Sequence, residues 1–378
     1  MTWRGNRERR SRALPVEELL PDGSHSPADI RDRIDIPMSR HLELGLLVWF
    51  LLASHVHAQP HTQGQRSTIE TAEVAGTSPW GPADEIGTLN MMSDASRTKI
   101  LSRVSGGTVH DLSVEFFNGM PSWHLLGDPR YQFWLTHSPR GTAVDDPAGI
   151  GREMNEKVAY TGDAVSMYTH TGTHIDGLNH FGLHGRVWNG FAADDHLGDQ
   201  GWRRAGVEKF PVIIARGVMI DVAGYKGVTV LPDSYSITPD DLQGALRLQG
   251  VRLEPGDVVL IRTGRMTLWP DNDAYILNQP GLGLSAARWL AEEQQAMVIG
   301  GDNLSLEHFP GERADNWVAV HTYLLAQRGI PIIEVAYLED LARERLYEFA
   351  FIGGSLKWRG ASAAPFRPVA LPVRQDFR

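Results

Sequence analysis

Apolar and polar residues alternate with two different periods along the chain, and the changes of period mark out its secondary structure. Short runs rich in β-branched residues predict strands at residues 109–116, 211–222, 257–264, 296–303 and 331–338. Helical patterns predict helices at residues 93–104, 239–249, 284–295 and 318–328. Thr238 is placed to cap the second helix, and Gly329 follows the last one. This alternation predicts a single α/β domain with a mixed sheet flanked by helices.

The first 58 residues lack these patterns. Residues 1–37 are rich in Arg, Glu, Asp and Pro without an apolar period, and we interpret them as an untranslated or disordered leader ahead of a true start at Met38. Residues 38–58 have the order of a signal peptide, because a basic start precedes an apolar stretch and Ala58 marks the expected cut. We therefore expect a periplasmic or secreted protein.

The remaining boundaries follow from composition. The apolar stretch at residues 44–53 is about ten residues long, whereas a membrane span takes roughly 20, so no permanent membrane anchor is expected. Residues 59–77 are polar and predict a flexible leader to a domain at residues 78–360. Residues 361–378 contain Pro and Arg without a period. They predict a C-terminal tail that wraps the surface or an adjacent subunit, or that frays.

Charge and composition exclude several classes of function. The formal net charge is −10 and no basic stripe is present, which argues against a nucleic-acid partner. The chain has no cysteine, so disulfides, thiolate zinc sites and cysteine nucleophiles are excluded. The sequence also lacks a phosphate-binding loop and a G-x-S-x-G nucleophile motif. Any metal must therefore be bound by His, Asp or Glu.

One segment, TGDAVSMYTHTGTHIDGLNHFGLH, concentrates the candidate chemistry. It holds four histidines within 15 positions, whereas the 15 histidines of the chain would give about 0.6 in a random window of that length. His170 and His174 would lie too far apart on a straight strand to share one ion, so we expect a bend at Gly172 that leads into a strand or loop. Imidazole and carboxylate ligands suit Zn²⁺, Mn²⁺ or Fe²⁺, and Asp176 could bridge two ions. The alternative is a set of hydrogen-bonded loop histidines or a metal-scavenging patch.

Other residues have weaker signals. Glu334 lies in the apolar run IPIIEVAYL, where a carboxylate is costly to bury unless it is paired or binds a metal. His321, taken by itself, would be a core histidine. The aromatic residues Trp123, Phe116, Phe117, Trp134 and Tyr168 could line a pocket for an apolar ring or belong to the core, and Trp123 is the strongest candidate. Asp302, His184 and His308 could hydrogen-bond to metal ligands and so orient them, or could make ordinary loop contacts.

The string HTGTHIDGLNH resembles the metal motif of the cyclase family, which includes bacterial kynurenine formamidases and isatin hydrolases. The resemblance extends over most of residues 78–340, including GMPSW, RTG, GGDNLSLE and VHTYLLAQRGIPIIE. It implies a barrel-like central sheet and assembly as a homodimer or homotetramer. It also implies site roles: metal ligation by His170, His174, Asp176, His321 and Glu334, proton transfer by His180, and a pocket lined by Trp123.

The sequence departs from the small formamidases. Leu178 stands where they have Pro, and there is extra sequence around residues 127–160, so the substrate is left open. We expect a hydrolase in which hydroxide bound to Zn²⁺ or Mn²⁺, as one or two ions, attacks a carbonyl while His180 delivers a proton to the leaving group. A cyclic amide, a lactone or an N-formyl aryl amide with an apolar or aromatic ring fits this scheme. The alternatives are a metal-dependent cyclase or dehydratase, and a non-catalytic exported metal-binding protein.

Overall fold

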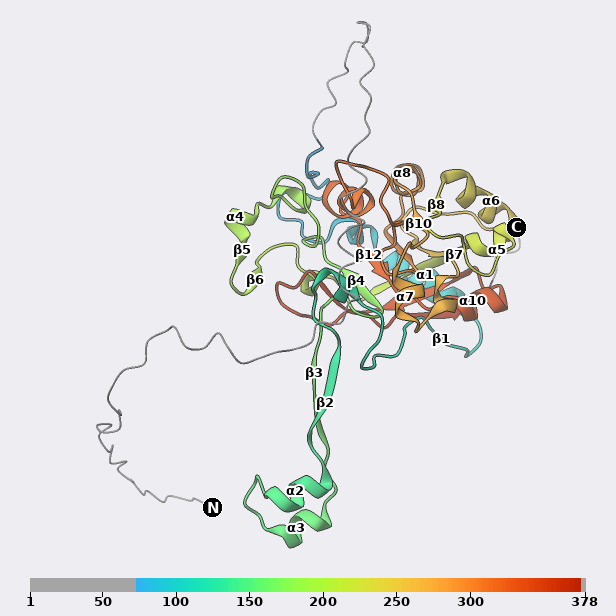
Figure 1. Cartoon of the computed structure of the whole chain (residues 1–378). Helices are drawn as coiled ribbons and strands as arrows, with labels where there is room; N and C mark the ends of the chain where they lie inside the picture. Colours follow the sequence, from blue (N-terminus) through green and yellow to red (C-terminus); the bar gives the residue numbers. More distant parts are fainter. Residues whose placement is uncertain (1–72, 375–378) are drawn as a thin grey trace, which may run out of the picture. The chain divides into compact units, whose positions relative to one another are not determined.

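The computed structural model describes residues 73–374 (Figure 1). The predicted leader, the predicted signal peptide and nearly all of the flexible leader lie outside the described residues, so export stays a prediction. Within the described range, no helix has the length and apolar character needed to cross a membrane.

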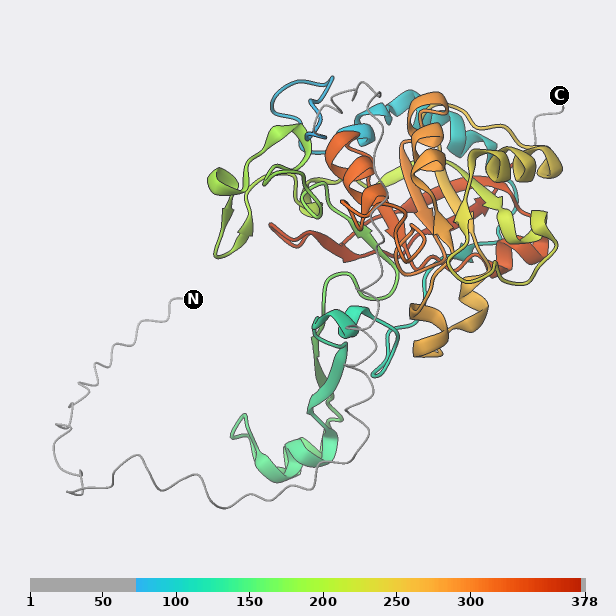
Figure 2. The same ribbon diagram turned by 45° about the horizontal axis from the view of Figure 1, so that its top comes forward.

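A nine-stranded mixed sheet forms the centre of the domain. Its order is β1 (His110–Asp111), β15 (Val369–Pro372), β13 (Glu348–Gly353), β7 (Ile213–Asp221), β9 (Val258–Arg262), β11 (Val298–Gly301), β12 (Ile332–Glu334), β4 (His174–Asp176) and β14 (Ala363–Pro365). The pairs from β7 to β12 are parallel, and the pairs outside them are antiparallel. The sheet curls without pairing its two ends, so the predicted mixed, barrel-like sheet is confirmed as a half-barrel (Figure 2).

The parallel strands explain the apolar runs of the sequence. Every residue of β9, β11 and β12 is buried, because the sheet is covered on both faces, and such strands carry apolar residues without alternation. Four strand predictions are thereby confirmed with narrower bounds. The predicted strand at 109–116 is shorter than expected, since β1 covers only His110–Asp111.

Helices pack around this sheet. Their bounds are α1 (Asp94–Arg103), α4 (Ala193–His196), α5 (Val222–Lys226), α6 (Pro239–Gln249), α7 (Asn272–Ile276), α8 (Leu284–Arg288), α9 (Ala319–His321) and α10 (Glu339–Glu344). Helix α6 begins after Thr238, the predicted cap, and the structure adds a capping box between Thr238 and Asp241. Helices α8 and α9 continue as π-helical turns to Glu293 and Gln327, which together match the two predicted helices. Short two-stranded pairs join β5 (Leu197–Gly198) with β6 (Gly201–Trp202), and β8 (Ser236–Ile237) with β10 (Gly281–Leu282).

The C-terminal segment differs from its prediction as a tail. Residues 361–378 supply two strands of the main sheet, β14 and β15. Strand β14 pairs with β4, and β15 joins β1 to β13. These short strands have no period of their own and are specified by partners far away in the sequence, so the local pattern could not reveal them. The domain therefore extends at least to Pro372.

The extra sequence around residues 127–160 forms an arm. Strands β2 (Gln132–His137) and β3 (Gly162–Ser166) make an antiparallel ribbon, and α2 (Pro139–Asp145) and α3 (Arg152–Lys157) lie at its end. The ribbon stands away from the nine-stranded sheet in both views (Figures 1 and 2). Its side chains are mostly exposed, including those of Phe133, Trp134 and Leu135.

Candidate metal centre and its pocket

A bend followed by a short strand brings the motif histidines together. Gly172 has a φ of +62°, in the left-handed region that glycine adopts readily, and a Cβ there would lie 2.7 Å from the Phe116 ring. The chain turns at this point and enters β4, so the predicted bend is confirmed. The ring centroids of His170 and His174 are 5.1 Å apart, much closer than an extended chain would allow.

The register of the sheet adds the glutamate. Glu334 ends β12 directly opposite His174 of β4, and Glu334 Oε2 lies 3.2 Å from His174 Nε2. His321, at the end of α9, approaches from the other side with its Nε2 3.1 Å from Glu334 Oε1 and 4.0 Å from Asp176 Oδ2. Three separate segments thus converge on one buried point.

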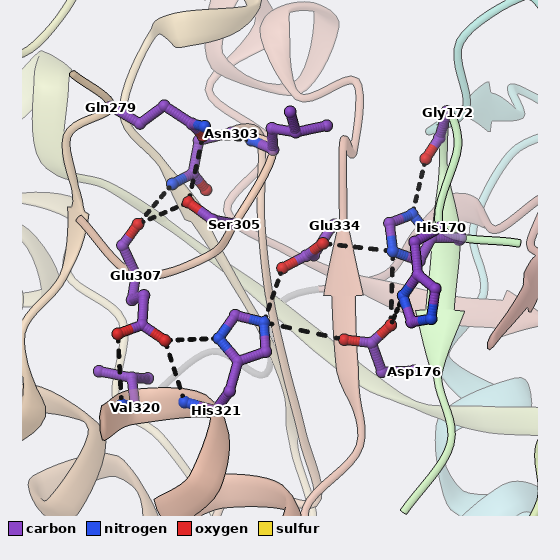
Figure 3. Close-up of polar contacts among 12 residues, drawn as sticks. His170, Gly172, Asp176, Gln279, Asn303, Ser305, Glu307, Val320, His321 and Glu334 are labelled. Atoms are coloured by element: carbon purple, nitrogen blue, oxygen red, sulfur yellow. Dashed lines mark hydrogen bonds and ion pairs between the residues drawn. The ribbon is translucent and has the colours of Figure 1, made fainter. Parts of the chain in front are cut away.

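Hydrogen bonds fix which ring nitrogens face this point. His174 Nδ1–H donates to the carbonyl of Gly172 at 2.8 Å, which leaves Nε2 toward Asp176 and Glu334. His321 Nδ1–H donates to Glu307, which leaves its Nε2 toward the same two carboxylates (Figure 3). In both rings an inward-facing nitrogen meets carboxylate oxygens, an arrangement that requires either a proton or a cation between them.

The centre has buried polar atoms without hydrogen-bond partners. Among the described residues, His174 Nε2 and both carboxylate oxygens of Asp176 are in this condition. His170 Nδ1 lies 2.8 Å from Asp176 Oδ1, but this contact is not aligned as a hydrogen bond. Buried polar atoms are nearly always paired in folded proteins, so a proton or a cation has to lie among these atoms.

The local charge favours a cation. Burial opposes the charged form of His174, yet the nearby carboxylates of Asp176 and Glu334 raise its pKa to about 10. The pKa of His321 is also raised, against burial, by Glu307 and Glu334. Two sets of three residues could each bind an ion, because the ligand atoms within each set lie within 4.8 Å of one another. One set is His170, His174 and Asp176, and the other is Asp176, His321 and Glu334. The residues therefore fit a divalent ion, and Asp176 belongs to both sets, as a bridging ligand would.

His180 lies beside the centre without belonging to either set. Its ring centroid is 3.8 Å from that of His170, and neither of its ring nitrogens has a hydrogen-bond partner among the described residues. Burial and the neighbouring His170 hold the pKa of His180 well below its ordinary value. A neutral imidazole at the edge of a pocket is free to accept a proton at neutral pH.

A cavity of about 210 Å³ opens onto this centre. Its wall contains the centre residues His170, His180, His321 and Glu334. The other lining residues are mostly aromatic or apolar: Trp123, Leu126, Asp128, Tyr168, Phe181, Ser305, Phe309, Trp317 and Val318. A ring-bearing substrate would therefore be held against apolar surface beside the ligands.

The aromatic candidates from the sequence divide between the pocket and other places. Trp123 and Tyr168 line the pocket. Phe116 and Phe117 pack in a smaller core cluster, and Trp134 lies exposed on β2. Position in the sequence could not show which aromatic residues line the pocket. The arm lies between Trp123 and Tyr168 in the sequence and carries Trp134 away from the pocket.

Sequence reasoning missed Glu307 as the residue that orients His321. Its carboxylate accepts from the ring Nδ1–H and from the backbone N–H of His321 at 3.1 Å. Its own carbonyl accepts from Ser305 at 2.8 Å and from Asn303 at 3.3 Å, which anchors the loop (Figure 3). The segment GGDNLSLE contains all three residues, but nothing local distinguishes its glutamate.

The three residues considered earlier for this orienting role lie elsewhere. Asp302 accepts hydrogen bonds from Thr263 and the backbone of Gly264. His184 is exposed, and His308 faces Glu312. A second missed partner is Ser362, whose hydroxyl lies 2.9 Å from His170 Nε2.

Comparisons with known proteins show the family and the fold of this chain. The Cyclase family model, described as "Putative cyclase", matches residues 110–308, more than half of the chain. Cyclase-like protein 3 of Oryza sativa subsp. japonica is 24% identical over 270 residues, which cover 70% of this chain and 80% of that protein. A crystal structure described as a novel cyclase has a TM-score of 0.69 at 25% identity, covering 79% of this chain and all of the other. Isatin hydrolase A from Labrenzia aggregata shares the fold, with a TM-score of 0.53 at 18% identity over 71% of this chain and 94% of that one.

Proposed function

Because this chain belongs to the cyclase family, we propose that it is a metal-dependent hydrolase that opens a cyclic amide or lactone, or cleaves an N-formyl aryl amide. The observation that carries the proposal is the buried set of unpartnered atoms on His174 and Asp176, next to ligand candidates His321 and Glu334 that line an aromatic pocket. A purely structural cluster would have paired its buried atoms within the chain.

The ligands would be His170, His174, Asp176, His321 and Glu334. Nitrogen and carboxylate donors without thiolate suit Zn²⁺ or Mn²⁺, as one or two ions. Such an ion, when bound, polarises a carbonyl and lowers the pKa of water to about 7. Glu307 holds the His321 ring in the tautomer that presents Nε2 to the centre.

His180 has the chemistry of a proton shuttle. Its depressed pKa keeps the imidazole neutral at pH 7, so it can take a proton from the attacking water. It then gives that proton to the departing nitrogen or oxygen. Trp123 and the other aromatic residues hold the substrate ring in place and keep bulk water away from the centre.

A test separates the metal ligands from the shuttle. The purified protein is loaded with Zn²⁺ or Mn²⁺ and assayed against a panel of lactones, cyclic amides and N-formyl anilines. We expect His180→Ala to keep its metal and lose about 10²- to 10⁴-fold in turnover, whereas Asp176→Ala loses both metal and activity. His184→Asn is the matched control, because this exposed histidine of the same motif lies outside the pocket lining and should keep full activity.

Three results would contradict the proposal. Equal metal content and equal activity in His180→Ala and Asp176→Ala would remove both assignments. Turnover without uptake of ¹⁸O from labelled water would favour the alternative of a metal-dependent cyclase or dehydratase. Intact metal with no activity across the panel would favour a non-catalytic metal-binding protein. Assembly as a homodimer or homotetramer stays a prediction.

A further inference from the structure

One carboxylate in the pocket has no role in the metal centre. Asp128 lines the cavity together with Trp123 and Tyr168. No hydrogen bond or ion pair joins its side chain to any other described residue. The other acidic residue of the lining, Glu334, belongs to the ligand set. Asp128 is therefore a half-buried carboxylate without a partner in the described chain, beside the aromatic residues of the pocket.

The pocket offers this charge no counter-ion. None of its lining residues is Lys or Arg, whereas elsewhere in the described structure Arg216 pairs with Asp257 and Arg262 pairs with Asp221. The charge of Asp128 acts on another lining residue: the pKa of Tyr168 is raised first by burial and then by the charge of Asp128. A cation that entered the pocket would be attracted, and a carboxylate would be repelled.

The aromatic wall favours the same kind of ligand. Trp123 and Phe309 meet edge to face with ring centroids 5.9 Å apart, and Phe309 lies 6.2 Å from Trp317. Phe181 continues the wall, 6.0 Å from Trp317. Indole and phenyl faces attract ammonium groups, most strongly where water is partly excluded. The wall and Asp128 together suit a ring that carries a protonated amine.

We propose that Asp128 is a specificity-determining residue that selects substrates whose ring bears a protonated amine and rejects those with a carboxylate at the same place. The inference rests on the proposed function, since the ring is held in the same pocket while its reacting carbonyl faces the metal ligands. Asp128 takes no part in the chemistry and acts through charge alone.

The test measures binding rather than turnover. Three benzohydroxamates, which chelate a metal through the same end, carry 4-aminomethyl, 4-methyl or 4-carboxy groups. Their Kd values for the Zn²⁺-loaded protein are measured by calorimetry. We expect the aminomethyl compound to bind about fivefold more tightly than the methyl compound, and the carboxy compound to bind more weakly than both. Asp128→Asn should remove this order while leaving the Kd of the methyl compound unchanged.

The control is Asp145→Asn, which removes an exposed aspartate of the arm that does not line the pocket and should preserve the order. The same charge preference in Asp128→Asn as in the unaltered protein would overturn the inference. Failure of all three hydroxamates to bind would count against the metal centre instead. In that case the binding of benzylammonium and of benzyl alcohol is measured by tryptophan fluorescence. Tighter binding of the cation that is lost in Asp128→Asn supports the role of Asp128. Equal binding of the two compounds to the unaltered protein overturns it.

Discussion

Two clusters of carboxylates in this domain have different kinds of basic groups beside them. At the end of β9, the Arg262 guanidinium donates to Asp221 at 2.8 Å and to both oxygens of Glu339 at 2.9 and 2.8 Å. In the metal centre, Asp176 and Glu334 are buried with no Lys or Arg beside them among the described residues. The first cluster contains an arginine, which is always charged, whereas the second has only histidines beside its carboxylates.

The difference explains what the second cluster is for. A buried carboxylate is costly unless a positive charge compensates it. In the Arg262 cluster the guanidinium pairs with both carboxylates. The cluster therefore has a structural role and connects β9 with α10. Around Asp176 and Glu334 the basic groups are imidazoles, and His174 and His321 turn their Nε2 atoms toward the carboxylates. This arrangement suits a divalent cation bound from solution.

The largest predicted effect comes from breaking the self-contained cluster. Arg262→Leu leaves Asp221 and Glu339 without their cation, which should lower the free energy of unfolding by about 3–5 kcal/mol. Added Zn²⁺ should not restore the loss, because the cluster is not a metal site. Chemical denaturation with and without the ion measures both quantities.

The control for this variant is an exposed pair of the same composition. Arg367 donates to Asp111 at 2.7 Å at the surface, and Arg367→Leu should cost about 1 kcal/mol or less. Equal losses in the two variants would mean that burial does not distinguish these pairs, and the comparison between the clusters would fail.

A smaller effect is expected from the residue behind His321. Glu307→Gln keeps the size of the side chain but removes the charge that holds His321 Nδ1–H, so metal affinity should fall about 10- to 100-fold. Competition with a chromophoric chelator measures the Kd. Glu293→Gln, an exposed glutamate remote from the site, should leave it unchanged. Unaltered affinity in Glu307→Gln would show that the packing of α9 alone positions the ring.

The parts of the fold that local chemistry specifies could be predicted from the sequence. The capping box at Thr238 fixes the start of α6, and the unbroken apolar runs of β9 and β11 indicate strands buried on both faces. The bend at Gly172 followed from the reach of two histidines toward one ion. Each of these features depends on neighbours within a few residues.

Features that depend on distant partners could not be predicted. Strand β14 forms by pairing with β4, and β15 forms by pairing with β1 and β13. The role of Glu307 depends on a ring 14 residues further along the chain that folds back onto it. Asp128 lies in a segment of ordinary loop composition, and only the cavity shows that it has no counter-ion.

We propose above all that a metal ion binds between the buried carboxylates and imidazoles of this centre. Anomalous X-ray diffraction from crystals grown with Zn²⁺ tests it most directly, with data collected on both sides of the zinc absorption edge. We predict one or two strong peaks bounded by His170, His174, Asp176, His321 and Glu334, and none there in crystals of Asp176→Ala. Fully loaded crystals whose only peaks lie at surface histidines such as His184 would contradict the account.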